Sequence, residues 1–471
     1  MPQCPLRNPQ IKGSSLQAWP HGELGASKHY PAGCQLSFSA RNVRRLSPLR
    51  WRSGSRARAL PLSVVWLARL LLRLTSWASM RLPMHRLRQK DSLAFVIGAG
   101  ATTYGLLVMW EGLSRASSRF GDFQIDGARA IRDGIPIWVP SSDVATVPFR
   151  SPAFYGHLLY LILYPLSFLP DGTDRAVFAF LNCMLLVLAV LVLARVANLD
   201  SLRSAIFFSF IASSTPTLVA IGNSQTSVLV LSLCAVGLLR RGTLQALCFG
   251  LASFKLSFLP NLMGATIGMG RKADAIKFLF GLAVPAIAFV ALTGRLNDLV
   301  APFVAQLGGP KVALGHGDLL SVLRIAGLSS VQVLALCVVA SAVFSHCVTR
   351  FLVSRGHCSL VILGLTMLVS LVTLGHLTYD YVVLAPLVAF WLSRPLSRVT
   401  IGLLTLTYLQ INSGKFLDTW EWLANSSISS LWLGTAGGVF FSLCLNVVIL
   451  LLALFDSGRR CDSGRRLTNA I

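Results

Sequence analysis

From residue 91 onward the chain alternates long apolar runs with short polar connections. A helix needs about 20 mostly apolar residues to cross the hydrocarbon core of a bilayer. The runs predict transmembrane helices at 92–112, 153–169, 175–197, 203–221, 223–239, 243–269, 275–293, 331–349, 358–375, 379–393, 398–412 and 429–455. Because several runs are short, we expect about ten to twelve spans. The predicted fold class is therefore all-α, a polytopic integral membrane protein.

The segments that flank these runs have a different pattern. Residues 1–58 are rich in Arg, Ser, Pro and Gly and lack apolar periodicity, which predicts a disordered basic extension. Residues 59–90 predict an interfacial amphipathic helix with a basic flank, since a spanning helix would have to bury Arg69 and Arg73. A solvated amphipathic helix is the alternative. Residues 456–471 predict a basic cytoplasmic tail.

The composition supports lipid as the surroundings of most of the chain. Of the 471 residues, 54% are hydrophobic and 13% are charged, against about a quarter charged in soluble domains. The net charge is +24, and residues 1–90 hold 16 of the Lys and Arg residues beside a single acid, Glu23. This basic stretch has no zinc-finger, RNP or heptad pattern, so we expect it to contact anionic membrane lipids and no nucleic acid. Met80 and Met84 are alternative starts of the natural chain.

Basic residues also predict the orientation. A basic cluster at 81–90 precedes the first span, which by the positive-inside rule predicts a cytoplasmic N-terminus and an external loop at 113–152. Basic pairs at 240–241 and 271–272 should both be cytoplasmic, although the 29 residues between them are apolar around Lys255. Two half-helices that enter, turn near Lys255 and return reconcile both ends, and such a break requires a protein or water cavity. A lysine that snorkels from an ordinary helix is the alternative.

The external loop holds the first candidate chemistry. Asp122 has the position of an N-cap and Gly134 that of a C′ residue, so residues 123–133 are predicted to be helical. The side chains predicted to share one face are Asp122, Asp126, Arg129 and Asp133. A capped surface helix with solvated ion pairs is one interpretation. A carboxylate held beside arginines at the membrane surface is the functional one.

One carboxylate and one cation suffice for sugar transfer from a lipid phosphate. The phosphate departs as a stable anion, so a single Asp can serve as general base on the acceptor hydroxyl while a cation stabilises the leaving group. The candidate cations are Lys255, Arg129, Arg132 and Arg150. A metal is dispensable in this scheme, and the ten cysteines show no CxxC or Cys/His metal spacing. We therefore expect neither a metal site nor a cofactor.

Five segments, taken in order, resemble glycosyltransferase family 87. They begin with GDFQIDG at 121, FRSPAF at 149, IGNSQTS at 221, GDLLSVLR at 317 and GHLTYDY at 375. The resemblance covers about residues 92–395. It implies a GT-C-type bundle, similar to the mycobacterial mannosyltransferases that use polyprenyl-phosphate-mannose. The implied reaction is inverting transfer of a hexose, with mannose favoured, to a lipid-linked or polysaccharide acceptor.

The resemblance also implies roles for residues of the first loop. The family's Asp-Phe pattern falls on Asp122 and Phe123, which makes Asp122 the catalytic base. Asp126 and Gly127 stand where the family usually has an aromatic pair, and this departure leaves the sugar or acceptor open. Asp126, Arg129 and Arg132 are candidate substrate-binding residues.

Three further motifs of the family fall inside the apolar runs. Its amide motif resembles Gly222 to Gln225 with the amides exchanged, so Asn223 and Gln225 are candidates for sugar hydroxyls, and interhelical hydrogen bonding is the alternative. The family's Lys before a Pro-containing run falls on Lys255, without the usual adjacent Pro. Its late His falls on His376, which with Asp380 four residues on is expected to orient a phosphate or an acceptor. A histidine at the membrane interface is the alternative.

The sequence thus predicts a membrane glycosyltransferase of the plasma membrane, with an external active site, Asp122 as base, and Lys255 with Arg129 or His376 as the clamp for the leaving phosphate. A transporter or lipid flippase remains open, because broken helices and intramembrane charges also mark substrate pathways. A polysaccharide polymerase or ligase is a further alternative, although such an enzyme favours a large loop late in the chain.

Overall fold

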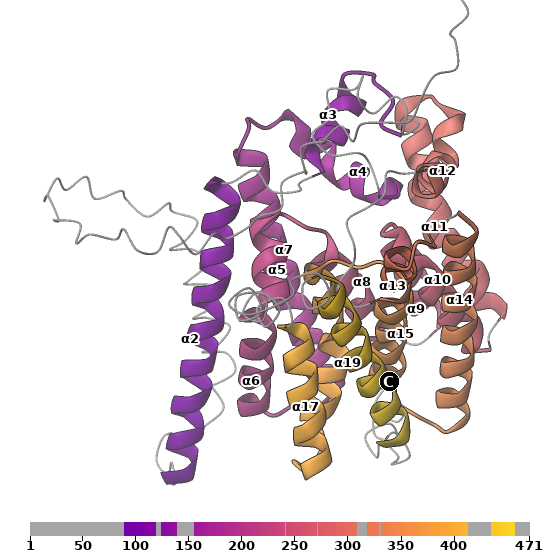
Figure 1. Ribbon diagram of the computed structural model, residues 1–471. Coiled ribbons are helices and arrows are strands. Elements are labelled where there is room, and N and C mark those ends of the chain that lie inside the picture. Colours follow the sequence, from indigo (N-terminus) through magenta and orange to yellow (C-terminus); the bar gives the residue numbers. More distant parts are fainter. Residues whose placement is uncertain are drawn as a thin grey trace, which may run out of the picture. The chain divides into compact units, whose positions relative to one another are not determined.

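The computed structural model describes residues 89–118, 124–138, 155–240, 242–270, 272–308, 318–328, 331–412 and 435–456. Their regular elements are all helices, without a strand in those ranges (Figure 1). By internal contacts the chain divides into two units, Met1–Trp77 and Ala78–Ile471, and the described residues belong to the second. The predicted basic extension, nearly all of the interfacial helix, Asp122, Arg150 and the tail beyond Asp456 lie outside the described residues.

The helices follow one another in the order of the predicted apolar runs. The α-helices are α2 (Gln89–Ser118), α3 (Ile125–Arg132), α4 (His157–Leu163), α5 (Thr173–Val196), α6 (Ser201–Ala212), α7 (Thr215–Gly222), α8 (Ser227–Gly237), α9 (Thr243–Ala252), α10 (Leu259–Gly268), α11 (Lys272–Thr293), α12 (Ala301–Gly308), α13 (Leu319–Ile325), α14 (Val331–Ser354), α15 (Ser359–Thr373), α16 (Ala385–Leu392), α17 (Arg398–Ile411) and α19 (Thr435–Asp456). The 3-10 helices are η4 (Pro165–Phe168), η5 (Leu256–Phe258), η6 (Leu296–Leu299) and η7 (Thr378–Leu384).

Every predicted apolar run contains a helix, and the chain is a multi-pass membrane protein. Among the described residues, five helices are long and apolar enough to cross a bilayer, namely α2, α5, α11, α14 and α19. The bent pair α6 and α7, with an angle of 59° between its halves, makes a sixth. The other apolar helices are too short, which is why this count lies below the ten to twelve expected. The first span also continues to Ser118, past its predicted end at 112.

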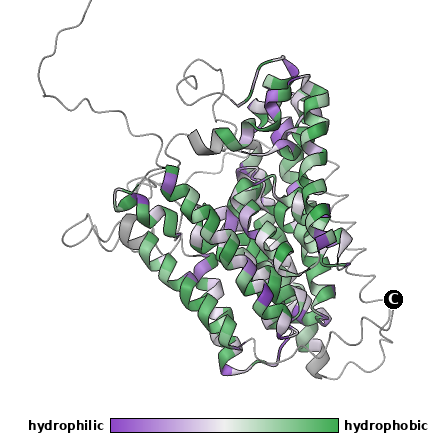
Figure 2. Cartoon of the chain, turned by 90° about the vertical axis from the view of Figure 1, so that its right-hand side faces the viewer, coloured by the Kyte–Doolittle hydropathy of each residue, from purple (hydrophilic) through white to green (hydrophobic). Residues whose placement is uncertain are grey.

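Helix α2 packs along the bent pair in the same direction. Added Cβ atoms at Gly98, Gly105 and Gly112 would meet Ala205, Phe208 and Ile221 in turn. Glycine at every seventh residue therefore forms a stripe that lets α2 approach α6 and α7 closely. Its opposite face is apolar and exposed, as Figure 2 shows for the bundle's outer helices, which suits contact with lipid.

Helices α9 and α10 form a re-entrant hairpin, here called hairpin 1 (residues 243–268). Helix α9 runs parallel to α11, because Lys277 donates to Thr243 and Gly250 lies against Gly281. Helix α11 starts directly after α10 ends, so α10 must return to the end from which α9 came. With 10 residues each, the arms are about 15 Å long, half of the hydrocarbon core. The predicted break near Lys255 is confirmed.

The returning arm of hairpin 1 packs on α14. Gly264 and Gly268 bring the backbones together, since a Cβ at either would lie under 3 Å from a carbonyl oxygen of α14. The Asn261 side chain donates to Ser345 at 2.8 Å and accepts from Ser341 at 2.7 Å. These pairs run in the same order along both helices, so α14 ends where α10 ends.

Helices α15, η7 and α16 form a second hairpin of this kind, hairpin 2 (residues 359–392). Gly364 lies five residues after the start of α15 and contacts Leu387, which lies five residues before the end of α16, so the arm formed by η7 and α16 is antiparallel to α15. Since α14 ends where hairpin 1 opens, both hairpins enter from the same end of the bundle. The sequence prediction had interpreted these arms as two separate spans.

The two ends of the bundle differ. We call one the α3 end, because α3, α4 and α12 lie there (Figure 1). It also holds the start of α5, through an ion pair of Arg129 with Asp174, and the end of α11, through a hydrogen bond from Arg295 to the Gly134 carbonyl. The opposite end, from which the hairpins enter, we call the basic end. Its described cations are Arg195, Arg203, Arg240, Lys272, Lys277, Arg350, Arg355, Arg394 and Arg398.

Candidate active site

Hairpin 1 carries Lys255 at its tip because the helix cannot continue there. Helix α9 ends at Ala252, and Lys255 leaves helical geometry with ψ 95° before a short 3-10 turn. Pro260 lies in the first turn of α10, where its missing N–H costs nothing. The tip is therefore an uncoiled segment, and it directs the Lys255 side chain into the protein, where that side chain is 8% exposed.

Hairpin 2 carries His376 and Asp380 at its tip. Helix α15 ends at Thr373, Leu374 is extended, and the chain resumes in η7 at Thr378. The carboxylate of Asp380, the third residue of η7, accepts the N–H of the capping residue Leu377 at 3.3 Å, as the acidic residue of a capping box does. His376 and Asp380 are 1% and 2% exposed. Two buried ionisable side chains therefore lie at this tip, within reach of hairpin 1.

The two tips meet through Asp380. Its Oδ1 atom accepts from Lys255 Nζ and from the Ser227 hydroxyl, and its Oδ2 atom lies 3.0 Å from His376 Nδ1. The other ring nitrogen of His376 lies 3.0 Å from the Ser370 hydroxyl. A carboxylate only accepts, so Nδ1 of His376 carries a proton. Ser227 is the first residue of α8 and brings a third chain segment to the cluster.

Aromatic rings surround the Lys255 ammonium. Its Nζ atom lies 4.7 Å from the ring centre of Tyr379, 5.8 Å from that of Tyr155 and 5.9 Å from that of Phe258. Such ring faces favour a cation, and the attraction strengthens where water is excluded. The rings and Asp380 together stabilise the charged form of a lysine that lies deep in the bundle.

The predicted amide motif forms the turn between α7 and α8. Asn223 ends α7, and Ser224 has φ 53°, a left-handed conformation that is uncommon for serine. The Gln225 carboxamide accepts from the Tyr155 hydroxyl at 3.4 Å, and its backbone carbonyl accepts from Asn182 at 2.8 Å. Strained turns of this kind concentrate at functional sites. Through Tyr155, Gln225 lies next to the ring that faces Lys255.

Two buried oxygen atoms at this turn are unsatisfied. Asn182 Oδ1 and Thr226 Oγ1 have no hydrogen-bond partner in the part of the chain that the structure describes. Both residues are at most 2% exposed. Buried polar atoms are almost always hydrogen-bonded, so we expect these two oxygens to accept hydrogen bonds from a hydroxyl group or a water.

Helix α3 begins two residues later than predicted. It begins at Ile125 with Gln124 as the capping residue, so Asp122 is not the N-cap; the buried Gln124 side chain accepts from Tyr160 instead. Its end follows the prediction, since Gly134 has φ 76°. The N–H groups of Gly134 and Ile135 bond to the carbonyls of Ile131 and Ala130, a Schellman motif.

The two arginines of α3 bind to the loop before α5. Arg129 forms ion pairs with the exposed Asp171 and the buried Asp174. Arg132 donates to the Ser167 carbonyl and to Asp133. Its hydrogen bond to Asp133 lowers the pKa of that carboxyl and raises the pKa of Arg132. These contacts fasten α3 to the bundle, and Arg129 does not pair with Asp126 as its position on the helix had suggested.

Asp318 caps α13 beside hairpin 2. Its carboxylate accepts from the Ser321 N–H at 2.7 Å and the Ser321 hydroxyl at 2.8 Å. Burial raises the pKa of Asp318, and hydrogen bonds from Ser321 and from the His376 backbone oppose that rise. Asp318 thus restrains the backbone at His376, while Arg324 lies in the last turn of α13.

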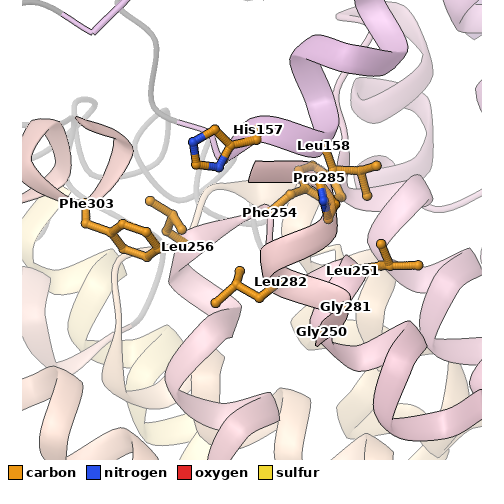
Figure 3. Close-up of a pocket in the computed structure, with 11 residues that line it drawn as sticks. His157, Leu158, Gly250, Leu251, Phe254, Leu256, Gly281, Leu282, Pro285 and Phe303 are labelled. Carbon is orange, nitrogen blue, oxygen red and sulfur yellow. The ribbon is translucent and has the colours of Figure 1, made fainter. Parts of the chain in front are cut away.

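Sequence reasoning missed the contact between hairpin 1 and the start of α4. The Gly156 N–H donates to the Phe254 carbonyl at 2.6 Å, and a Cβ at Gly156 would lie 3.2 Å from the Phe254 backbone. His157 next to it bonds to the Asp298 carbonyl at 2.7 Å. Figure 3 shows the small apolar pocket at this contact. Its lining residues are Gly156, His157, Leu158, Gly250, Leu251, Phe254, Leu256, Gly281, Leu282, Pro285 and Phe303.

The structure thus brings some of the predicted residues together and not others. Lys255 and His376 share Asp380, and Gln225 lies nearby through Tyr155. Asp126, Arg129 and Arg132 lie on α3 and form a separate group. The described residues contain no group of three or more His, Cys, Asp or Glu that could hold a metal ion.

Residues 154–374 match the model of glycosyltransferase family 87. The matched segment includes the α7–α8 turn and hairpin 1, and it ends at Leu374 in the tip of hairpin 2. Neither the search of curated proteins nor that of solved structures gave a match.

Proposed function

Since the chain carries a glycosyltransferase family 87 domain over residues 154–374 and is a membrane glycosyltransferase, we propose that it transfers a hexose from a polyprenyl phosphate to a lipid-linked or glycan acceptor with inversion. The observation that carries this proposal is the buried Lys255 ammonium at the meeting point of two re-entrant hairpins. A cation held inside the bundle suits a phosphate that arrives on a lipid and leaves as an anion.

Lys255 is the proposed partner of the leaving phosphate. Inside a protein, an ion pair with phosphate is far stronger than in water, so the ammonium can bind the donor's phosphate as a second partner beside the Asp380 carboxylate. Both ring nitrogens of His376 are engaged, with Asp380 and Ser370. His376 therefore acts in this proposal by orienting the phosphate site, and Lys255 contacts the phosphate.

The other predicted residues are assigned by their location. Asn223 and Gln225 bind sugar hydroxyls, which is supported by the unsatisfied oxygens of Asn182 and Thr226 at the same turn. Asp126, Arg129 and Arg132 line the approach of the substrate at the α3 end. Asp122, just before α3, is the general base that deprotonates the acceptor hydroxyl.

We further propose that the protein lies in the plasma membrane with the α3 end outside. The cations of the basic end agree with the positive-inside rule. At the α3 end, acidic residues such as Asp126, Asp171 and Asp174 nearly balance the arginines. This orientation exposes Asp122 to the external side.

The direction of the hairpins bears on the transporter alternative. In transporters with inverted repeats, broken helices occur in two halves of opposite topology. Hairpins 1 and 2 enter from the same end of the bundle, which favours a fixed site approached from the α3 end. A transferase therefore accounts for the arrangement better than a flippase.

The proposal is tested with membranes that contain the protein and radiolabelled polyprenyl-phosphate-mannose. We expect Asp122→Asn to abolish mannose transfer while the protein inserts normally. Asp133→Asn, which removes an exposed carboxylate from the same loop, is the matched control and should transfer at the wild-type rate. Full transfer by Asp122→Asn would remove Asp122 as the base.

A further inference from the structure

Asp380 has no acceptor capacity left for a substrate. A carboxylate offers about four acceptor positions, two on each oxygen. Oδ1 receives Lys255 and Ser227, and Oδ2 receives His376 and the Leu377 N–H. Each donor comes from protein, so a role as general base would require one of these bonds to break. The arrangement suits a residue that holds other side chains in place.

The donors of Asp380 come from segments far apart in the chain. Ser227 begins α8 and Lys255 forms the tip of hairpin 1, 153 and 125 residues away from Asp380. His376 and Leu377 belong to the tip of hairpin 2 itself. The carboxylate therefore fixes the position of one tip relative to the other, and with it the direction of the Lys255 ammonium.

Stability alone does not account for such a pair. Desolvating two charges costs about as much as their attraction returns, and apolar replacements of buried ion pairs are often as stable. Lys277 and Asp274 form the comparison within this chain: their N–O distance is 3.5 Å and the ion pair lies within one helix turn of α11, although Lys277 also donates to Thr243 at the start of α9. The ion pair of Lys255 with Asp380 differs because it joins the tips of two hairpins.

We propose that Asp380 is a positioning residue of the transfer reaction, which holds Lys255 and, with His376, fixes the ammonium at the place where the donor's phosphate is bound. The inference rests on the proposed function, since it takes Lys255 as the phosphate's partner. In the resting enzyme Asp380 is the counter-ion of Lys255. When the donor binds, its phosphate becomes a second partner of the Lys255 ammonium. Asp380 then keeps the ammonium in its position.

The test separates binding from turnover. Undecaprenyl monophosphate serves as the binding probe, and undecaprenyl-phosphate-mannose as the donor in transfer assays. Asp380→Glu keeps the charge but displaces the carboxylate by one methylene. Since a misplacement of about 1 Å can cost about 100-fold, we expect kcat to fall about ten- to a hundredfold. The Kd of the probe and the unfolding temperature should stay near wild type, and Asp274→Asn should leave kcat unchanged.

A purely structural role would give another pattern, in which kcat, Kd and the unfolding temperature of Asp380→Glu change together. That pattern, or an unchanged kcat, overturns the proposal. If Asp380→Glu does not fold, Ser227→Ala removes one donor to the same oxygen without a change of charge. It should lower kcat about threefold or more through the same positioning effect, and an unchanged kcat there overturns the proposal as well.

A double variant distinguishes this inference from the proposed function. Lys255→Met with Asp380→Leu removes both charges and should fold, because the pair is replaced by apolar side chains. We expect it to lose transfer and phosphate binding. Transfer at the wild-type rate would refute the role of Lys255 and hence the proposed function. A loss there beside full activity of Asp380→Glu would refute only the positioning role.

Discussion

Lys255 and Asp380 are 125 residues apart in the chain and lie at the tips of two re-entrant hairpins, yet their side chains form an ion pair with side-chain exposures of 8% and 3%. Neither arm of hairpin 1 crosses the bilayer, so the tip needs partners inside the protein. The ion pair, Ser227 and the rings around Lys255 supply them. The same contacts that permit the broken helices thus assemble the candidate active site.

The first prediction concerns stability. Lys255→Met alone leaves the Asp380 carboxylate buried without its cation and should destabilise the protein by about 3–5 kcal/mol. Asp380→Leu alone should cost a similar amount, whereas the double variant should unfold close to wild type. Thermal unfolding of the purified protein in detergent measures all three. Additive losses in the double variant would mean that the two residues do not interact in the folded state.

The second prediction concerns the crossing of α10 with α14. A Cβ at Gly264 would lie 2.2 Å from the Ala342 carbonyl oxygen, so Gly264→Ala must push the helices apart and should cost about 1–3 kcal/mol or more. Gly100→Ala in α2 is the matched control, because nothing lies within 4 Å of its Cβ position. The free energy of unfolding of that variant should rise by up to about 1 kcal/mol, because alanine has the higher helix propensity. If the unfolding temperatures of Gly264→Ala and Gly100→Ala shifted in the same direction, the close contact of α10 with α14 at Gly264 would be contradicted.

Hairpin 1 was predictable and hairpin 2 was not. Basic pairs on both sides of residues 242–270 required an even number of passes, and Pro260 indicated a break. Hairpin 2 is flanked in the same way by Arg355 and Arg394, but its arms were each long and apolar enough to be interpreted as a span. Arginines on the same side are compatible with two spans as well as with a re-entrant hairpin, so charge could not distinguish them.

The partners of the predicted site residues lay beyond the reach of local patterns. Lys255 and His376 were found from the sequence, while the ion pair of Lys255 with Asp380 depends on packing between distant helices. Ser227 and Tyr155 have no pattern of their own and became visible only through their contacts with Asp380 and Gln225.

The third prediction concerns the attachment of α3. Arg129→Gln removes the cation that pairs with the buried Asp174, which keeps only the N–H groups of Gly172 and Arg175 as its donors. The variant should lose about 1–3 kcal/mol of stability. Arg203→Gln, whose partner Asp200 is exposed, should lose less than about 1 kcal/mol. Equal losses in chemical unfolding would show that the Asp174 pair contributes no more than a surface pair.

The fourth prediction concerns pH. Burial raises the pKa of Asp318 in the folded state, so the folded protein holds that proton more tightly than the unfolded chain. This contribution to stability is fully present below the unfolded pKa and is lost as pH rises through the folded pKa. Asp318→Asn keeps an N-cap acceptor for Ser321 and removes the titration. The unfolding temperature of Asp318→Asn should therefore fall less between pH 4 and pH 7 than that of wild type. If both unfolding temperatures fell equally, Asp318 would not be the source of this pH dependence.

The fifth prediction concerns the direction of both hairpins. Single cysteines placed at Lys272 and Arg398 in a cysteine-free background should react with an impermeant maleimide only in inside-out vesicles, because both hairpins open at the basic end. A cysteine at Asp171, which is 73% exposed at the α3 end, should react only in intact spheroplasts. If hairpin 2 entered from the α3 end instead, labelling at 272 and 398 would occur on opposite sides of the membrane.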